Sequence, residues 1–164
     1  MTETMMSKRT FLGSAAALLG GLAIGGCSKQ AGAVEKFEVT KSPEQWRAIL
    51  TPAQFAVLRD EGTERSRSSP LNDEHRRGTY QCAGCALPVY DSRAKFESGT
   101  GWPSFTAPIE GAVRTKPDRG LLGTRTEVHC RRCGGHLGHV FDDGPPPTRQ
   151  RWCMNGIAME FIPA

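Results

Sequence analysis

The sequence predicts a mainly β fold, a small antiparallel β domain preceded by two short helices. Beyond Gly78, short runs of strand-forming residues alternate with turn residues. The 164-residue chain contains 19 glycines and 11 prolines, which favour strands and loops over long helices. Four of its six cysteines form two Cys-x-x-Cys pairs, a pattern typical of small metal-stabilised domains. At this length we expect one domain and a short extension.

Two helix start signals lie before residue 63. In Ser42-Pro43-Glu44-Gln45, a capping Ser precedes Pro at the first helical position and Gln lies three residues after the cap. This segment predicts a helix through about residue 50. Thr51-Pro52-Ala53-Gln54 repeats the signal, and Gly62 is expected to end the second helix. The polar residues 63–78 indicate an irregular loop.

The remaining chain predicts short strands separated by turns. They are expected at residues 79–81, 88–90, 112–114, 127–129, 139–141 and 159–162.

The N-terminus has the features of an export signal. The basic pair Lys8-Arg9 precedes an apolar run rich in small residues that ends at Cys27. Ile24-Gly25-Gly26-Cys27 resembles a bacterial lipobox, in which the cysteine is lipidated, and Ser7–Leu12 resembles a twin-arginine signal with Lys in place of the first Arg. Simple cleavage and the general export route remain alternatives.

We therefore expect a signal peptide at residues 1–26, a tether at residues 27–39 and one domain at residues 40–164. The expected location is the bacterial periplasm or cell envelope, with a lipid at Cys27 as the only membrane attachment.

The net charge of +4 is mild, and the basic residues are dispersed along the chain. A basic stripe with interleaved aromatic residues, the usual sign of nucleic-acid binding, is missing from the sequence, so we expect no nucleic-acid partner.

The two Cys-x-x-Cys pairs supply four soft ligands, the set that tetrahedral zinc prefers. They are Cys82 with Cys85, and Cys130 with Cys133, each in a glycine-containing turn. A closed four-sulfur site is structural because it leaves no coordination position for substrate. Two disulfides are the alternative in an oxidising compartment. A thioredoxin-like redox pair is disfavoured because neither pair lies in a βαβ pattern.

One further cysteine is a candidate nucleophile. Cys153 lies in the segment Arg151-Trp152-Cys153-Met154-Asn155. Because alternate side chains of an extended chain share a face, Arg151, Cys153 and Asn155 could line one pocket. A nearby cation favours the reactive thiolate. A buried, inert cysteine is equally compatible with these residues.

Two other segments carry candidate site residues. His136 and His139 could supply acid or base groups, or be ordinary core or surface histidines. Trp102 lies in a turn rich in Gly and Pro, where it either caps the core or walls an apolar substrate pocket.

These segments together resemble the methionine-R-sulfoxide reductase B family, over roughly residues 40–163. A joint match of this kind is specific, whereas one motif alone is not. The matching segments are Gly62-Thr63-Glu64, Cys82-x-x-Cys85, Gly101-Trp102-Pro103-Ser104-Phe105, Arg125-Thr126-Glu127-Val128, Cys130-x-x-Cys133-Gly134, residues 136–145 and Arg151-x-Cys153-x-Asn155.

The resemblance implies a fold of two antiparallel sheets with a structural four-cysteine zinc site. It also implies that the Cys153 thiolate attacks the sulfoxide sulfur of the R epimer and becomes a sulfenic acid. His139, with His136 beside it, is then the candidate acid. Arg151 and Asn155 complete the catalytic set. Trp102, Phe141 and Asp143 are the candidate substrate-binding residues.

The implied substrates are oxidised proteins or peptides, and free methionine sulfoxide is a further candidate. We expect a monomer that repairs exported proteins under oxidative stress. Many family members carry a resolving cysteine where this chain has Thr100, and Gly156 stands where Ser often follows the Asn. The resemblance therefore predicts an external, thioredoxin-like dithiol as the reductant of Cys153. A zinc-stabilised binding module without catalysis and a peroxidase-like thiol enzyme are the competing functions.

Overall fold

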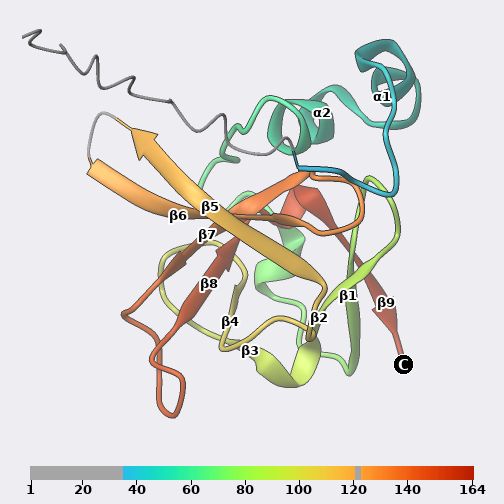
Figure 1. The fold of residues 1–164 in the computed structure, drawn as a ribbon. Helices are drawn as coiled ribbons and strands as arrows, with labels where there is room; N and C mark the ends of the chain where they lie inside the picture. Colours follow the sequence, from blue (N-terminus) through green and yellow to red (C-terminus); the bar gives the residue numbers. More distant parts are fainter. Residues whose placement is uncertain (1–34, 121–122) are drawn as a thin grey trace, which may run out of the picture. The chain divides into compact units, whose positions relative to one another are not determined.

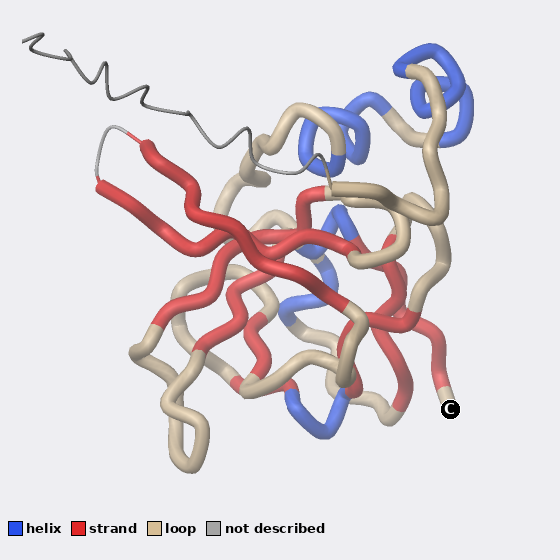
Figure 2. Tube along the Cα trace, viewed as in Figure 1, coloured by secondary structure: helices blue, strands red, loops and turns tan. Residues whose placement is uncertain are grey.

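The computed structural model describes residues 35–120 and 123–164. The predicted signal peptide and Cys27 lie outside the described residues. From Glu35 to Ala164 the chain forms one compact unit, which Figure 1 shows as a ribbon. Strands make up most of its regular structure and its helices are short, as Figure 2 shows. Among the described residues, no helix combines the length and apolar character needed to cross a membrane.

Both predicted helices are present. Helix α1 spans Pro43–Ile49 and helix α2 spans Pro52–Leu58, and both begin with the reciprocal capping contacts between Ser or Thr and Gln. Helix α2 ends at Leu58, four residues before Gly62, and the chain then turns at Glu61, which has a φ of 55°. Phe55 and Leu58 are buried, and α2 packs against strand β7 (His136–Phe141).

The strands form two antiparallel sheets, as predicted (Figure 1). The smaller sheet has the order β2-β1-β9. Its strands are β1 (Gly78–Cys82), β2 (Pro88–Asp91) and β9 (Met159–Pro163). The larger sheet has the order β3-β4-β8-β7-β6-β5. Its strands are β3 (Lys95–Phe96), β4 (Ser104–Phe105), β5 (Val113–Gly120), β6 (Gly123–Cys130), β7 (His136–Phe141) and β8 (Arg151–Met154).

Cys153 lies outside every strand that was expected from the sequence. It lies on a separate strand, β8, because the single-turn helix η3 (Gly156–Ala158) turns the chain from the larger sheet into β9 of the smaller one. The other single-turn helices are η1 (Pro70–Asn72) and η2 (Ser92–Ala94).

The core between the sheets is aromatic. Tyr80, Tyr90 and Phe105 are fully buried, and the rings of Tyr90 and Phe105 stack with their centroids 4.3 Å apart. The Tyr90 hydroxyl donates to the sulfur of the buried Met154, with 3.0 Å between the oxygen and the sulfur. Met154 directly follows Cys153, so this contact holds in place the buried residue next to the candidate nucleophile.

Candidate active site and metal centre

The four paired cysteines meet at one point. Cys82 is the last residue of β1 and Cys85 lies in the turn before β2. Cys130 is the last residue of β6 and Cys133 lies in the turn before β7. All four sulfurs lie within 4.8 Å of one another. The cluster therefore connects the smaller sheet to the larger one.

The sulfur spacing fits a metal ion and not disulfides. The sulfurs of Cys82 and Cys133 are 3.7 Å apart, and those of Cys85 and Cys130 are 3.5 Å apart. A disulfide requires about 2.05 Å. Four sulfurs bound tetrahedrally to one zinc ion lie about 3.8 Å apart, given a Zn–S distance of about 2.3 Å. The disulfide alternative is therefore wrong for these four cysteines in this structure.

The pairing of strands brings the predicted site residues together. His139 on β7 lies opposite Cys153 on β8, and Phe141 lies opposite Arg151. Ser104 on β4 lies opposite Cys153 from the other side. Directly opposed residues of antiparallel strands share a face of the sheet. One face of the larger sheet therefore carries the thiol between an imidazole and a hydroxyl.

A glycine allows β7 and β8 to approach closely beside the thiol. A Cβ atom added to Gly138 would lie 2.2 Å from the carbonyl oxygen of Cys153 and 2.9 Å from the Cα atom of Met154. A larger residue here would push β8 away from His139.

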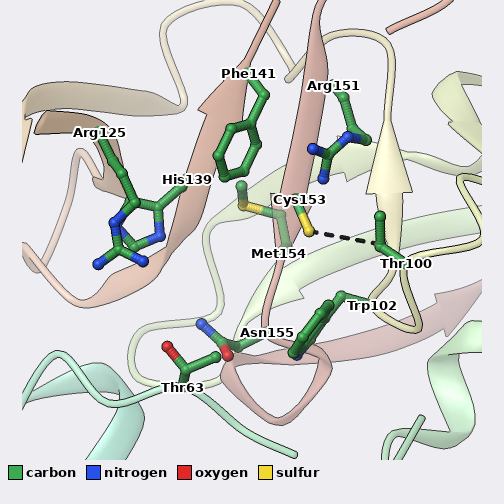
Figure 3. A pocket seen from close by; sticks show the side chains of 10 residues that line it. All are labelled: Thr63, Thr100, Trp102, Arg125, His139, Phe141, Arg151, Cys153, Met154 and Asn155. Atoms are coloured by element: carbon green, nitrogen blue, oxygen red, sulfur yellow. Dashed lines mark hydrogen bonds between the residues drawn. The ribbon is translucent and has the colours of Figure 1, made fainter. Parts of the chain in front are cut away.

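Cys153 opens into a cavity of about 280 Å³, shown in Figure 3. Six of the predicted site residues line it, and in the view the rings of Trp102 and Phe141 lie on opposite sides of the Cys153 sulfur. The lining residues are Thr63, Thr100, Trp102, Arg125, His139, Phe141, Arg151, Cys153, Met154 and Asn155. Aromatic walls with a few converging polar groups are typical of a small-molecule site.

Arg151 supplies a positive charge beside the thiol. Its guanidinium makes two 2.8 Å bonds to the Asp143 carboxylate and lies 4.3 Å from the centre of the Phe141 ring. The bond to Asp143 raises the pKa of Arg151, and Cys153 contributes to the same shift. Asp143 itself does not line the cavity and reaches it only through Arg151.

His139 is held by a carboxylate on the neighbouring hairpin. Its Nε2 atom lies 2.8 Å from Asp118 Oδ2, and Arg125 donates to the same oxygen at 2.6 Å. Burial lowers the pKa of His139 below its ordinary value, and the bond to Asp118 opposes that shift only in part. His139 is therefore mainly neutral near pH 7, with Asp118 available to stabilise its charged form.

His136 does not line the cavity. It is 2% exposed, and its ring packs edge-on against that of His139 with 5.3 Å between the centroids. Its Nδ1 atom lies 2.9 Å from the buried carboxylate of Glu127. Burial alone would raise the pKa of Glu127, but contacts with His129, His136 and Lys116 outweigh it and hold that pKa well below the usual range. His136 thus packs against His139 and is hydrogen-bonded to a buried carboxylate.

The chain is similar to known proteins over most of its length. A family model described as the SelR domain matches residues 50–163. The chain is 50% identical over 129 residues to a protein of Pseudomonas entomophila strain L48 called "Peptide methionine sulfoxide reductase MsrB", covering 77% of this chain and 97% of that one. A protein of the same name from Bradyrhizobium diazoefficiens is 52% identical over 127 residues, covering 77% of this chain and 91% of its own length.

The chain belongs to the MsrB family, that of the SelR domain. The predicted resemblance is confirmed. The matched range contains the four clustered cysteines and every residue that lines the cavity around Cys153.

Sequence reasoning gave no role to Glu64, although the residue lay in a segment that matched the MsrB pattern. Its carboxylate accepts bonds from the backbone nitrogens of Gly156 at 2.6 Å and Ile157 at 2.9 Å. Its backbone nitrogen donates to Asn155 Oδ1 at 2.9 Å, and its carbonyl accepts from Trp102 Nε1 at 3.1 Å. Glu64 therefore fixes two cavity residues and the turn that follows β8.

Asn155 is more constrained than a free substrate-binding amide. It is 4% exposed, its Nδ2 atom donates to the carbonyl of Leu137 at 3.1 Å, and its Oδ1 atom accepts from Glu64. The amide joins β7 to the loop that carries Glu64, so its position in the cavity wall is set by these two contacts.

Asp118, Arg125 and Glu127 were also without a role in the sequence analysis. Across β5 and β6, Asp118 lies opposite Arg125, and Glu127 lies opposite His139 on β7. Arg125 and Glu127 are two positions apart on one strand, and alternate strand residues share a face. This spacing was the sequence signal that could have placed both on the side of the sheet that carries His139.

Two departures from the common MsrB pattern have clear structural settings. Thr100 Oγ1 lies 3.9 Å from Cys153 Sγ, so a side chain at this position reaches the thiol directly (Figure 3). At Gly156, an added Cβ atom would lie 1.9 Å from the hydroxyl oxygen of Ser69 and 3.3 Å from Pro103 Cγ. The buried Ser69 occupies the space that a serine at position 156 would need.

Proposed function

We propose that this protein reduces methionine-R-sulfoxide in oxidised proteins and peptides to methionine, with Cys153 as the nucleophile. Membership of the MsrB family makes it an oxidoreductase acting on methionine sulfoxide. The observation that carries the proposal is the position of Cys153: it faces an aromatic-walled cavity, with Arg151 beside it on β8 and His139 opposite it on β7.

The geometry supports a substrate pose with the sulfoxide sulfur at the thiol. The methyl group of the substrate packs against Trp102, whose ring is held in place by the bond from Nε1 to Glu64. The thiolate is the attacking form of a cysteine, and the Arg151 guanidinium places a positive charge beside Cys153. This guanidinium is itself fixed by Asp143, so Asp143 acts on the substrate through Arg151.

In the first step an S–O bond forms at Cys153 and the S–O bond of the sulfoxide breaks. The sulfoxide sulfur gains two electrons and leaves as methionine, and Cys153 is oxidised to a sulfenic acid. The oxygen needs a proton during this transfer. His139 supplies it in our proposal, because Asp118 stabilises the imidazolium form that gives the proton up.

The second step restores the thiol. Within residues 35–120 and 123–164, the other cysteines belong to the four-sulfur cluster and not to the cavity. We therefore assign the reduction to an external, thioredoxin-like dithiol. It is oxidised to a disulfide, the sulfenic acid oxygen leaves as water, and Cys153 returns to the thiol.

Cys82, Cys85, Cys130 and Cys133 are assigned to one structural zinc ion. A bound ion would tie the turn of β1 and β2 to the turn of β6 and β7, and its binding free energy would add to the stability of the fold. The four sulfurs complete a tetrahedral shell, so the ion has no open position for substrate.

The location of the protein remains a proposal from the sequence: export, with a lipid at Cys27. The supporting residues are the basic pair, the apolar run and the segment Ile24–Cys27. Labelling cells with radioactive palmitate tests it. The protein should carry label and sediment with membranes, and Cys27→Ser should abolish both. An unlabelled, cleaved protein would refute lipidation.

The test of activity is a stereospecific assay with dithiothreitol as the reductant. Peptides containing the separate R and S epimers of methionine sulfoxide are offered to the full chain. We expect methionine only from the R epimer, and we expect Cys153→Ser to abolish it while metal content and fold persist. Cys27→Ser is the matched control and should remain active.

Three outcomes would count against the proposal. Full activity of Cys153→Ser would refute the nucleophile, and turnover of the S epimer would refute the stereochemistry. Loss of activity in Cys27→Ser, together with a trapped Cys27–Cys153 disulfide, would refute direct reduction by an external dithiol.

A further inference from the structure

A chain of three hydroxyl groups leads from the candidate nucleophile into the core. Thr100 Oγ1 lies 3.9 Å from Cys153 Sγ. Ser98 Oγ lies 2.8 Å from Thr100 Oγ1 and 2.8 Å from Ser104 Oγ. Ser104, which is 1% exposed, donates to the carbonyl oxygen of Trp102 at 3.1 Å.

The carbonyl at the inner end fixes the direction of every bond in the chain. Each hydroxyl has one proton to donate. Since Ser104 gives its proton to the carbonyl of Trp102, the proton between Ser98 and Ser104 must come from Ser98. The proton between Thr100 and Ser98 must then come from Thr100. The oxygen of Thr100 therefore offers only lone pairs to Cys153.

An acceptor at this point distinguishes the chemical states of Cys153. A thiol S–H or a sulfenic acid S–O–H can donate to Thr100 Oγ1, whereas a thiolate or a sulfenate anion cannot. If every hydroxyl donated in the opposite direction, the hydrogen bond to the Trp102 carbonyl would be lost, so the reversed arrangement costs free energy.

The geometry points to a role for Thr100: its hydroxyl oxygen, held as an acceptor by Ser98 and Ser104, binds the sulfenic acid of Cys153 in its neutral form and slows its further oxidation. This inference rests on the proposed function for the origin of the sulfenic acid. Further oxidation starts from the sulfenate anion, which attacks hydrogen peroxide; the sulfur loses two electrons, gains a second oxygen as sulfinic acid, and water is released. Stabilising the neutral form retards this step.

Such protection matters more in this chain than in one with a resolving cysteine. A thiol at position 100 would consume the sulfenic acid within the molecule. Here the intermediate waits for a dithiol to arrive by diffusion, and the hydroxyl chain occupies the place of the missing thiol.

The test follows the formation of sulfinic acid in the metal-loaded full chain. One turnover with an R-sulfoxide peptide and no reductant generates the sulfenic acid, hydrogen peroxide is added, and intact-mass measurement gives the rate at which the second oxygen appears on Cys153. We expect Thr100→Val to raise this rate about 3- to 10-fold, equivalent to one neutral hydrogen bond. Thr100→Ser should restore the original rate.

Ser98→Ala provides an independent arm. It removes the acceptor for the Thr100 proton, so Thr100 can turn its O–H toward the sulfur and stabilise the anion. Ser98→Ala should therefore also raise the rate of sulfinic acid formation, although Thr100 is unchanged. Thr115→Val, at an exposed position of β5, is the matched control and should leave the rate unaltered.

Unchanged rates in both Thr100→Val and Ser98→Ala would overturn the inference, as would failure of Thr100→Ser to rescue. Methionine yield in the same turnover reports separately on the proposed function. If the original chain releases no methionine, that function fails. In that case one equivalent of hydrogen peroxide forms the sulfenic acid directly. The comparison of variants then still decides the role of Thr100 and Ser98.

Discussion

Removing the Glu64 carboxylate is the perturbation for which the structure gives the clearest magnitude. Its two oxygens accept the backbone N–H groups of Gly156 and Ile157, at 2.6 and 2.9 Å. A hydrogen bond to a charged group contributes about 1.5–3 kcal/mol. Because Glu64 is only partly buried, we take the lower end of that range, which gives about 3 kcal/mol for the two bonds.

Two substitutions separate the charge from the side chain. Glu64→Ala loses both bonds and should lower the free energy of unfolding by about 3 kcal/mol, or the melting temperature by about 10 °C. Glu64→Gln keeps one acceptor oxygen, but its NH₂ group then faces a backbone N–H, so about half of that loss is expected. Activity should fall roughly tenfold or more in the Ala variant, because the turn after Asn155 is released.

The assay is urea unfolding of the metal-loaded protein, followed by circular dichroism, with kcat/KM measured on the same samples. Glu97→Gln is the matched control. The Glu97 side chain is 70% exposed, and its 3.2 Å contact with Lys95 is a surface ion pair worth at most about 1 kcal/mol. The reasoning is refuted if Glu64→Ala unfolds within 0.5 kcal/mol of the original chain, roughly the size of an ordinary surface substitution.

Three further predictions concern packing, protonation and metal. Gly156→Ser should cost about 1–3 kcal/mol by overpacking against Ser69, and adding Ser69→Gly should recover most of it in a double-mutant unfolding cycle; independent, additive losses would contradict this. Asp118→Asn removes the carboxylate that favours protonated His139, so NMR titration should show a still lower pKa for His139. When the pH is raised, the activity that depends on protonated His139 should then be lost at a lower pH in Asp118→Asn than in the original protein. An unchanged or raised pKa of His139 would contradict the assignment. Cys133→Ser should reduce the bound zinc measured by mass spectrometry and lower the unfolding midpoint, whereas an unaltered midpoint would show that the fold does not depend on the metal.

Several parts of this molecule are determined by local sequence and could be predicted from it. The two helices begin with capping boxes, in which Ser42 and Thr51 each exchange bonds with a Gln three residues later. The spacing of the paired cysteines predicted one four-sulfur cluster, and the fifth cysteine of the described residues, Cys153, faces a cavity.

Other parts depend on contacts between distant segments. Strands β3 and β4 contain two residues each, too few for any periodic pattern. The bond between the Glu64 backbone and Asn155 spans 91 positions, and no local rule connects them. Asp118 reaches His139 only through the register of β5, β6 and β7, which the sequence does not reveal.

The contact between Tyr90 and Met154 has a consequence for the durability of the protein. Met154 lies beside the candidate nucleophile, yet it is 0% exposed, and the Tyr90 hydroxyl donates to the sulfur lone pair that an oxidant would attack. Met159, the other methionine among the described residues, is 4% exposed. A domain that acts on methionine sulfoxide thus shields both of its own described methionines from solvent oxidants.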